Sequence, residues 1–359
     1  MSGITTENNF FSQTLHFWYR ANGRDLPWRS TNDPYAIWIS EIILQQTRVE
    51  QGLDYYLRFM QRFPDANTLA DADEIDILKL WQGLGYYSRA RNLHFAAKQI
   101  KNDFGGTFPS TYQEVRSLKG IGDYTAAAVC SFAYGQPYAV LDGNVYRVLA
   151  RFFGIHTPID TAKAKKEFSE LAQHLLDKKN PSLYNQSIMD FGALQCTPAS
   201  PRCDSCPLAE KCAALSLNEQ SVLPLKSKKT ISRKRYFNYF YILNGGKTYL
   251  HKRTGNDIWK NLYEFPLIET AEETPLQDLV SMGFLHEIDI NACRITEKMS
   301  LKHILTHQTI FAKFYIIDFC EQHTKNISNF IEIKESDIDS YPIARLSEIF
   351  LEQKDTNRK

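Results

Sequence analysis

Four of the chain's cysteines fall within seventeen residues, in the spacing C-x6-C-x2-C-x5-C. They are Cys196, Cys203, Cys206 and Cys212. Four thiolates this close in sequence can hold a tetrahedral zinc ion or a cubane iron–sulfur cluster, and the spacing alone leaves both open. Three prolines within or beside the run favour a compact loop around one metal centre. The sequence therefore predicts a segment that folds around a metal rather than around an apolar core.

The pattern of the chain changes after this cysteine run. Up to about residue 215, amphipathic stretches joined by short Gly- or Pro-containing connections predict helices. Six basic residues stand among the last ten of segment 216–235, which predicts an exposed basic linker. From 236 to 359, aromatic and β-branched runs predict a smaller α/β domain. We therefore expect a helical domain over 1–215, with its metal loop at 196–212, and a second domain over 236–359.

Composition restricts the surroundings in which the chain works. Hydrophobic residues make up 43% of the 359 residues, enough for two cores, and the formal net charge is +1. No apolar stretch reaches the length of about eighteen residues that a membrane helix needs, and the N-terminus lacks a signal-peptide pattern. We expect a soluble, intracellular protein. With so little net charge, a nucleic-acid partner would have to be held by local patches and backbone amides.

A glycine pair marks a second candidate site. Leu118 to Ala126 reads LKGIGDYTA, and its two glycines, Gly120 and Gly122, allow a tight turn between two helices. Such a turn exposes amides at the N-terminus of the next helix, where they can bind a phosphate without side-chain charge. A purely structural turn explains the same pattern, so the pair on its own leaves both interpretations open.

Two carboxylates stand in environments that suit cleavage of a glycosidic bond. Such cleavage needs one protonated and one ionised carboxyl group. Asp33-Pro34 predicts the start of a helix on which Glu41 shares a face with apolar residues, so desolvation would raise its pKa. Asp142 precedes Gly143 and a helical run, where a helix N-terminus favours the ionised form. A solvent-facing glutamate and a simple N-cap are the alternative interpretations.

These segments together resemble one family. The cysteine spacing, the LKGIGDYTA hairpin, WISEIILQQT around Glu41 and LDGNVYRVLAR from Leu141 are similar to the helix–hairpin–helix DNA glycosylases of the endonuclease III and MutY kind. The resemblance implies a mainly α glycosylase domain in which the four cysteines hold a [4Fe–4S] cluster. It also implies that Glu41 protonates adenine at N7 and that Asp142 stabilises the sugar cation. Asn144 and Tyr124 match family positions beside the scissile nucleotide.

Tyr124 separates two branches of that family. The bifunctional relatives carry a lysine there and cleave the backbone through a Schiff base, which a phenol cannot form. The resemblance therefore implies a monofunctional adenine-DNA glycosylase that removes adenine opposite 8-oxoguanine or G in base excision repair. An endonuclease III-like glycosylase/lyase and a non-catalytic Fe–S DNA-binding protein are the alternatives.

Further segments match family regions that contact DNA. A base-flipping enzyme must extrude a nucleotide and fill the gap. The resemblance assigns Tyr86 as a wedge and Gln46 as an inserted side chain, and it places a set of side chains near the adenine: Arg24, Trp28, Arg29 and Gln186. Periodicity alone predicts instead that Trp28 and Tyr86 are core aromatics.

The C-terminal segment resembles the Nudix-like domain of the same family. Ile258 to Pro266 (IWKNLYEFP) carries the resemblance, whereas the R-E-x-x-E-E arrangement of Nudix hydrolases is missing from the residues after Pro266. Leu301 to His307 is similar to the loop that recognises 8-oxoguanine, with Thr306 and His307 at its tip; a structural role for His307 is the alternative. The implied partner is double-stranded DNA with an A:8-oxoG or A:G mispair, bound by a monomer in the cytoplasm, at a bacterial nucleoid.

Overall fold

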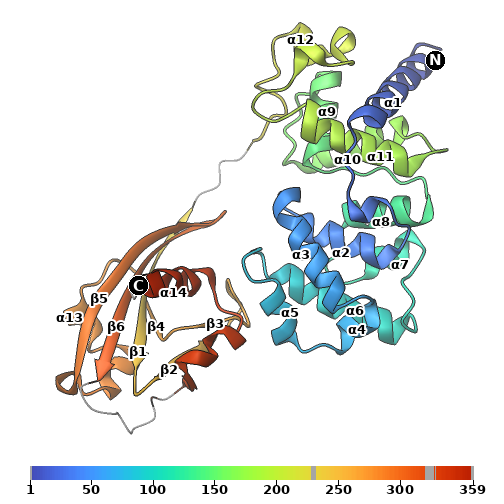
Figure 1. The fold of residues 1–359 in the computed structure, drawn as a ribbon. Helices are drawn as coiled ribbons and strands as arrows, with labels where there is room; N and C mark the ends of the chain where they lie inside the picture. The colour runs from blue at the N-terminus through green and yellow to red at the C-terminus, as the bar shows by residue number, and fades with distance from the viewer. Residues whose placement is uncertain (1, 228–231, 320–326, 328, 357–359) are drawn as a thin grey trace. The chain divides into compact units, whose positions relative to one another are not determined.

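The computed structural model describes residues 2–227, 232–319, 327 and 329–356 (Figure 1). They form two compact units. The helical unit comprises Met1–Asp71 and Asn92–Lys228, and the C-terminal unit comprises Ala72–Arg91 and Lys229–Lys359. Within the described residues, no helix is both long and apolar enough to cross a bilayer.

Helices build the first part of the chain, as the sequence predicted. The longer ones are α1 (Ser2–Asn22), α2 (Pro34–Leu44), α3 (Val49–Arg62), α6 (Ser88–Asp103), α8 (Asp123–Tyr134), α9 (Gly143–Phe153), α10 (Ala162–Leu175) and α11 (Pro181–Asp190). The shorter ones are η1 (Pro27–Arg29), α4 (Ala66–Asp71), α5 (Glu74–Leu80), α7 (Tyr112–Ser117), the π turn η2 (Phe191–Gln195), η3 (Cys203–Ser205), η4 (Ala209–Lys211) and α12 (Ala213–Ser216).

Local chemistry explains where the functional helices begin. Asp33 caps α2 because its side chain accepts hydrogen bonds from Tyr35 N at 3.0 Å and Ala36 N at 3.3 Å. Pro34 follows as the first helical residue, where its missing N–H costs nothing. Asp142 caps α9 by accepting from Val145 N at 2.8 Å. Helix α2 therefore starts where the sequence predicted, and α9 starts at Gly143, directly after the Asp142 cap.

The predicted glycine turn joins α7 to α8. Leu118 ends α7, and Ile121 N donates back to Leu118 O at 3.1 Å. Gly120 has a φ of 81°, and a Cβ atom there would lie 2.7 Å from Cβ of Asn92. Gly122 caps α8 without any side-chain hydrogen bond. A helix–hairpin–helix therefore presents the first-turn amides of α8 without a side-chain cap.

One apolar core holds the second half of the helical unit together. Buried side chains from α1, α8, α9, α10 and α11 meet in it, among them Phe11, Leu149 and Phe168, each fully buried. Phe11 packs on Phe152 with ring centroids 4.8 Å apart. Because α8, α9 and α11 share this core, the polar residues at their ends stay at fixed places relative to one another.

Two sheets build most of the C-terminal unit (Figure 1). The four-stranded sheet runs β4-β1-β6-β5, with β1 parallel to β6 and the other neighbours antiparallel. The three-stranded sheet runs β3-β2-β7. The elements are β1 (Arg233–Leu243), β2 (Lys247–Lys252), β3 (Tyr263–Glu264), β4 (Leu267–Thr270), α13 (Leu276–Leu279), η5 (Gly283–Glu287), η6 (Ile290–Ala292), β5 (Cys293–Ile304), β6 (Gln308–Phe319), β7 (Ile331–Lys334), η7 (Glu335–Ser340) and α14 (Arg345–Thr356).

Alternation along β1 explains why it lies inside the unit. Phe237, Tyr239 and Tyr241 face a core that includes α14, whereas Phe240 and Ile242 face a second core beneath α13 and η5. Successive side chains of a strand point to opposite faces, so a run that is apolar at every position must be covered on both sides. Residues 236–243, 248–251 and 310–319, which belong to the aromatic and β-branched part of the sequence, all lie in strands.

The segment between the units differs from the predicted linker over 216–235. Leu223 is 2% exposed, and its carbonyl accepts from Arg151 Nε at 3.0 Å. Ile159 N donates to Leu225 O at 2.9 Å, so residues up to 227 pack on the helical unit. Arg233, at the other end, begins β1. Residues 228–231 lie outside the described residues. The part of the segment before them packs on the helical unit because burial of the apolar Leu223 side chain stabilises it there.

Candidate active site

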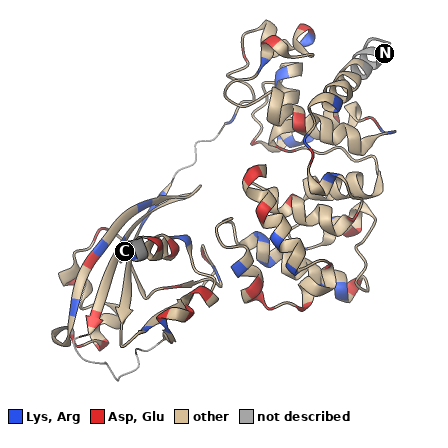
Figure 2. Cartoon of the chain, in the orientation of Figure 1, with Lys and Arg blue, Asp and Glu red and all other residues tan. Residues whose placement is uncertain are grey.

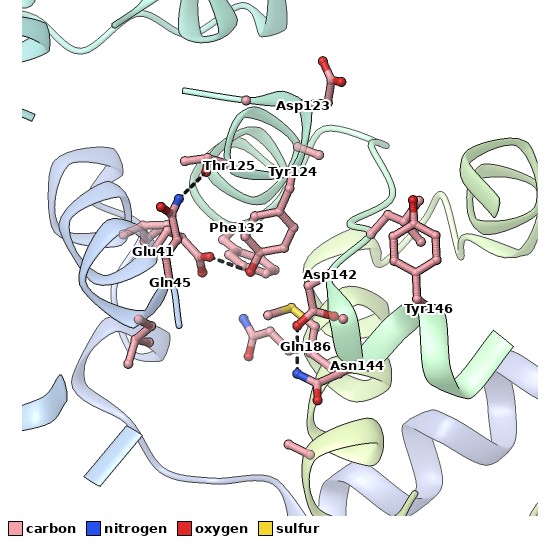
Figure 3. A pocket seen from close by; sticks show the side chains of 18 of the residues that line it. Glu41, Gln45, Asp123, Tyr124, Thr125, Phe132, Asp142, Asn144, Tyr146 and Gln186 are labelled. Carbon is pink, nitrogen blue, oxygen red and sulfur yellow. Dashed lines mark hydrogen bonds between the residues drawn. The ribbon is translucent and has the colours of Figure 1, made fainter. Parts of the chain in front are cut away.

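A large cavity opens in the helical unit between α2, α8, α9 and α11. Its volume is about 1250 Å³. Eleven of the residues predicted from the sequence line it: Arg24, Trp28, Arg29, Glu41, Gln46, Gly120, Gly122, Tyr124, Asp142, Asn144 and Gln186. Figure 3 shows Glu41 from α2 and Asp142 from the start of α9 in this one pocket, with Tyr124 of α8 reaching Glu41. The fold thus gathers side chains that stand more than a hundred residues apart in sequence.

Glu41 is a buried acid that accepts a hydrogen bond from a buried phenol. It is 7% exposed, and its Oε2 accepts from the hydroxyl of Tyr124 at 2.6 Å. Burial raises the pKa of Glu41 to about 7, while Tyr124 and Arg29 act to lower it and Asp142 acts to raise it. Ile37 and Leu44 line the same cavity, as the shared helix face predicted. Near neutral pH this carboxyl group can therefore both hold and release a proton.

Tyr124 keeps its own proton. Burial, followed by the neighbouring charge of Glu41, raises the pKa of Tyr124 well above its usual value. The phenol therefore acts as a hydrogen-bond donor to Glu41, and it holds that carboxyl group in one orientation toward the cavity.

Asp142 sits in the opposite wall of the cavity, held by donors. Its Oδ1 accepts from Val145 N and its Oδ2 from Asn144 Nδ2, both at 2.8 Å. Arg147 Nη2 donates to Asn144 Oδ1 at 2.8 Å, which fixes the direction of that amide. Burial raises the pKa of Asp142 above its ordinary value, and these hydrogen bonds oppose the rise. The helix N-terminus favours the ionised form of Asp142, as expected from the sequence. Desolvation opposes it and has the larger effect on the pKa.

A charged cluster, called the clasp, borders the cavity and consists of Asp190, Arg24 and Arg29. Sequence reasoning missed its central residue, Asp190. Asp190, at the end of α11, is completely buried and binds both Arg24 and Arg29. Arg29 Nη1 and Nη2 lie 2.6 Å and 2.7 Å from the two carboxylate oxygens. Tyr19 donates to Gln186 Oε1 at 2.8 Å beside them. The sequence did carry a signal for Asp190, because it is a single acid within a mostly apolar helical stretch. The same pattern selected Glu41.

Trp28 and Gln46 border the cavity in different ways. Trp28 is 7% exposed and packs edge-on against Tyr56 with ring centroids 5.0 Å apart, so it belongs to the core as well as to the wall. Gln46 is exposed with a φ of 57°. A left-handed conformation is uncommon for residues other than glycine. This conformation of Gln46 turns the chain sharply just after α2.

Three further predicted residues belong to the C-terminal unit. Tyr86, also left-handed with a φ of 48°, is 50% exposed. Thr306 and His307 are exposed in the turn between β5 and β6. The Tyr86 hydroxyl lies 2.9 Å from Thr306 Oγ1, a hydrogen bond in which either oxygen can be the donor. The structure thus brings together the predicted wedge and the predicted lesion-reading loop, while neither lines the cavity.

The four cysteines gather on the loop that follows η2. Burial raises the pKa of the Cys203, Cys206 and Cys212 thiols, and the nearby charge of Cys196 raises each of these pKa values further. Arg151 Nη1 donates to Cys196 Sγ at 3.4 Å, a contact that suits a sulfur carrying negative charge. Across the described part of the chain, no three Cys, His, Asp or Glu side chains converge as the ligands of one metal ion. Four thiolates on one loop are a donor set of the kind that holds an iron–sulfur cluster.

Charge on the ribbon is mixed rather than separated. Figure 2 shows Lys and Arg interspersed with Asp and Glu over both units. This distribution agrees with the net charge of +1. Any nucleic-acid surface must therefore depend on local geometry, such as the α7–α8 hairpin, more than on a broad basic face.

Comparison with known proteins finds a family match for each of two parts of the chain. Residues 39–174 match the HhH-GPD superfamily of base excision DNA repair proteins, and residues 238–353 match the NUDIX domain. A protein named adenine DNA glycosylase from Buchnera aphidicola (Schizaphis graminum) is 37% identical over 302 residues, covering 84% of this chain and 85% of that protein. The human protein of the same name is 40% identical over 222 residues, covering 59% of this chain and 41% of that protein.

Solved structures resemble the helical part. A thermostable thymine-DNA glycosylase has a TM-score of 0.56 and 30% identity, covering 60% of this chain and 99% of that one. An endonuclease III in complex with DNA has a TM-score of 0.53 at 19% identity, covering 60% of this chain and 98% of that one, and supports the fold alone. On the extent and identity of these matches, the chain belongs to the adenine DNA glycosylase family, within the helix–hairpin–helix superfamily of base excision DNA repair proteins.

Proposed function

We propose that this chain is a monofunctional adenine-DNA glycosylase that hydrolyses the N-glycosidic bond of adenine paired with 8-oxoguanine or G. The observation that carries the proposal is the pairing of a buried, protonatable Glu41 with a donor-held Asp142 in one cavity. These are the two carboxyl states that glycosidic cleavage requires. Family membership supplies the base that is removed.

Glu41 is the general acid. With a pKa of about 7, it is protonated in a large fraction of molecules near neutral pH and can donate to N7 of an extruded adenine. Protonation makes the base a better leaving group. Tyr124 aims the carboxyl group through its 2.6 Å hydrogen bond.

Asp142 stabilises the sugar cation that develops as the bond breaks. Its charge is supported by the amide of Val145 and the side chain of Asn144. A fixed anion costs no reorganisation at the moment of reaction, which is why preorganised charge lowers the barrier. Water then completes the hydrolysis and leaves an abasic site.

Among the described residues that line the cavity, none offers the alternative lyase reaction a suitable amine. Tyr124 occupies the position expected for the Schiff-base lysine. Lys165 lines the cavity but bonds to Asp123 Oδ2 at 2.7 Å, and that hydrogen bond raises its pKa. A protonated, paired ammonium is not a nucleophile. The product should therefore be an intact strand.

The extruded base would be held by the wall opposite α8. Arg24, Arg29 and Gln186 supply donors and acceptors there, and Trp28 closes the apolar side. Gln46 and Tyr86 are the side chains we assign to the gap left in the duplex. Both have a left-handed backbone, a strained conformation of the kind found at functional sites.

Duplex binding rests on the hairpin and on the C-terminal unit. Gly120 and Gly122 leave the N-terminal amides of α8 without a side-chain cap, ready for a phosphate. Thr306 and His307 would read the 8-oxoguanine. We further propose that the protein works as a monomer.

Cys196, Cys203, Cys206 and Cys212 would hold a [4Fe–4S] cluster. Its role would be structural, fixing the loop after η2, because hydrolysis of a glycosidic bond transfers no electron. Arg147 and Arg151 of α9 already bind the loop, at Cys196 O (2.7 Å) and Thr197 O (2.8 Å).

Single-turnover cleavage of an A:8-oxoG duplex tests the function. We expect strand breaks only after alkali treatment, which converts abasic sites into breaks. Breaks without alkali would establish the lyase instead, and no abasic product at all would establish a non-catalytic DNA-binding protein.

A further inference from the structure

Asp190 is a completely enclosed carboxylate behind the part of the cavity wall that Arg24 and Arg29 form. It is 0% exposed, and its two oxygens accept five hydrogen bonds from Arg24 and Arg29. Arg24 contributes its backbone N at 3.0 Å and Nε at 3.0 Å, and Arg29 contributes both terminal nitrogens. This joins the end of α11 to the segment before α2. Asp190 itself is absent from the cavity lining, so it acts through its partners.

The clasp is not electrically balanced. Two guanidinium groups share one carboxylate, so one positive charge remains beside the cavity. Burial alone would raise the pKa of Asp190, but the hydrogen bonds from Arg29 and Arg24 outweigh it and lower that pKa. Asp190 therefore stays ionised and cancels part of the arginine charge. Tyr19, whose ring lies 5.8 Å from the Arg29 guanidinium, adds no charge while its phenol is protonated.

The charge of Arg29 reaches Glu41. The charged groups that act on Glu41 are Arg29 and Asp142, and Tyr124 donates to it. Arg29 favours the ionised form of Glu41, whereas catalysis as proposed needs the protonated form. Anything that neutralises Arg29 therefore helps Glu41 to keep its proton.

We propose that Asp190 is a positioning residue of adenine excision. It holds Arg24 and Arg29 in the wall of the cavity and offsets the charge of Arg29, so that Glu41 stays protonated near neutral pH. The inference deepens the proposed function, on which its catalytic consequence rests.

The sign of the effect follows from electrostatics. In Asp190→Asn the shape of the side chain is kept, but Arg29 is no longer neutralised, and the ionised form of Glu41 is favoured. The pKa of Glu41 should therefore fall, by about one unit for a change of one buried charge nearby. A merely structural role for Asp190 would lower activity equally at every pH.

Infrared titration of Glu41 tests the coupling without any substrate. The carbonyl band of the protonated carboxyl group, assigned by its loss in Glu41→Gln, is followed against pH in the full chain. We expect its midpoint to lie about one pH unit lower in Asp190→Asn than in the wild type. Asp190→Glu, which keeps the charge, should leave the midpoint within about 0.3 units of the wild type.

Single-turnover excision from an A:8-oxoG duplex gives the catalytic consequence. The wild-type rate should fall as pH rises through the pKa of Glu41, and in Asp190→Asn this fall should begin at lower pH. The matched control is Glu264→Gln, which removes another buried, arginine-bound carboxylate (2.8 Å from Arg253) in the C-terminal unit. That variant should keep the wild-type pH profile.

The two readouts separate failure of the inference from failure of the function. An unmoved infrared midpoint in Asp190→Asn overturns the role of Asp190 whatever the activity. A moved midpoint without any adenine release by the wild type would keep the coupling but reject the proposed function. If Asp190→Asn does not fold, as judged by circular dichroism, Asp190→Ser replaces it, because its smaller side chain leaves room for water between the guanidinium groups. The same downward shift is then expected.

Discussion

At the scale of single residues, the proposed chemistry depends on whether Glu41 can carry a proton inside the cavity. Water would keep a glutamate ionised at neutral pH, and removal from water raises its pKa to about 7 here. Burial raises the pKa of Asp142 too, but hydrogen bonds from Val145 N and Asn144 Nδ2 oppose the rise and favour the ionised form. The two carboxyl groups of one cavity therefore differ in how strongly their neighbours oppose the effect of burial on the pKa.

Glu41→Gln tests the acid directly. The amide keeps the volume and can still accept from Tyr124, but it has no proton to give. We expect a loss of excision of about a hundredfold or more, as for removal of a general acid, with duplex affinity within about twofold. Excision is measured under single turnover and affinity by fluorescence anisotropy with the uncleaved A:8-oxoG duplex.

The control for this variant is Glu170→Gln, an exposed glutamate of α10 whose side chain is 69% exposed. It should behave like the wild type in both measurements. Excision by Glu41→Gln within about tenfold of the wild type would remove Glu41 from the acid role.

At the scale of elements, the α7–α8 hairpin shows why glycine occurs twice in a short turn. Gly120 adopts a φ of 81°, and the nearest atom to an added Cβ would be Asn92 Cβ at 2.7 Å. Both strain and contact therefore oppose a side chain there. Gly122 faces open space instead, where an approaching backbone could enter. The turn has a shape that backbone contacts require.

Gly120→Ala should weaken duplex binding more than it weakens the fold. A side chain in the left-handed region costs about 1–2 kcal/mol, and the clash with Asn92 must displace the turn. We expect duplex affinity to fall about tenfold or more, because the α8 amides move away from the phosphate. Thermal unfolding and anisotropy are measured on the same samples.

Gly135→Ala is the matched control. Gly135 ends α8 with a φ of 62° and has no atom within 4 Å of an added Cβ, so it carries the same strain at the other end of that helix. An equal loss of DNA affinity in Gly135→Ala would show that the hairpin has no special part in binding.

At the scale of the whole molecule, two units divide the proposed work. The helical unit contains the cavity with both carboxyl groups, and the C-terminal unit contains Tyr86, Thr306 and His307. In the C-terminal unit, residues distant in sequence meet: Arg91 Nη1 donates to Lys260 O at 2.8 Å, and Asn261 Nδ2 to Glu74 Oε1 at 2.6 Å. The segment that carries the predicted wedge is therefore part of the unit that carries the predicted lesion reader.

Thr306→Ala combined with His307→Ala should reduce lesion preference and leave chemistry intact. Both residues are exposed in a turn, so the fold should be unaffected, while polar contacts to 8-oxoguanine would be lost. The ratio of excision rates for A:8-oxoG over A:G should fall by about tenfold, with adenine still removed. Ser336→Ala, exposed in η7, serves as control. An unchanged ratio would assign Thr306 and His307 a structural role only.

Local pattern determined a large part of this protein. The caps at Asp33 and Asp142, the glycine turn and the strands from 236 onward follow from short-range preferences, which a sequence carries explicitly. The resemblance of the motifs then led to the family.

Only the tertiary structure decided what those residues experience. Glu41 has its raised pKa because packing buries it away from water, an effect that outweighs the lowering by the Tyr124 hydrogen bond. Asp190 meets Arg24 across 166 positions of sequence. The linker predicted over 216–235 was too long at both ends. Leu223 is buried in the helical unit, and Arg233 pairs with β6 as the first residue of β1. Burial and long-range pairing depend on which segments meet in space, and no local pattern contains that information.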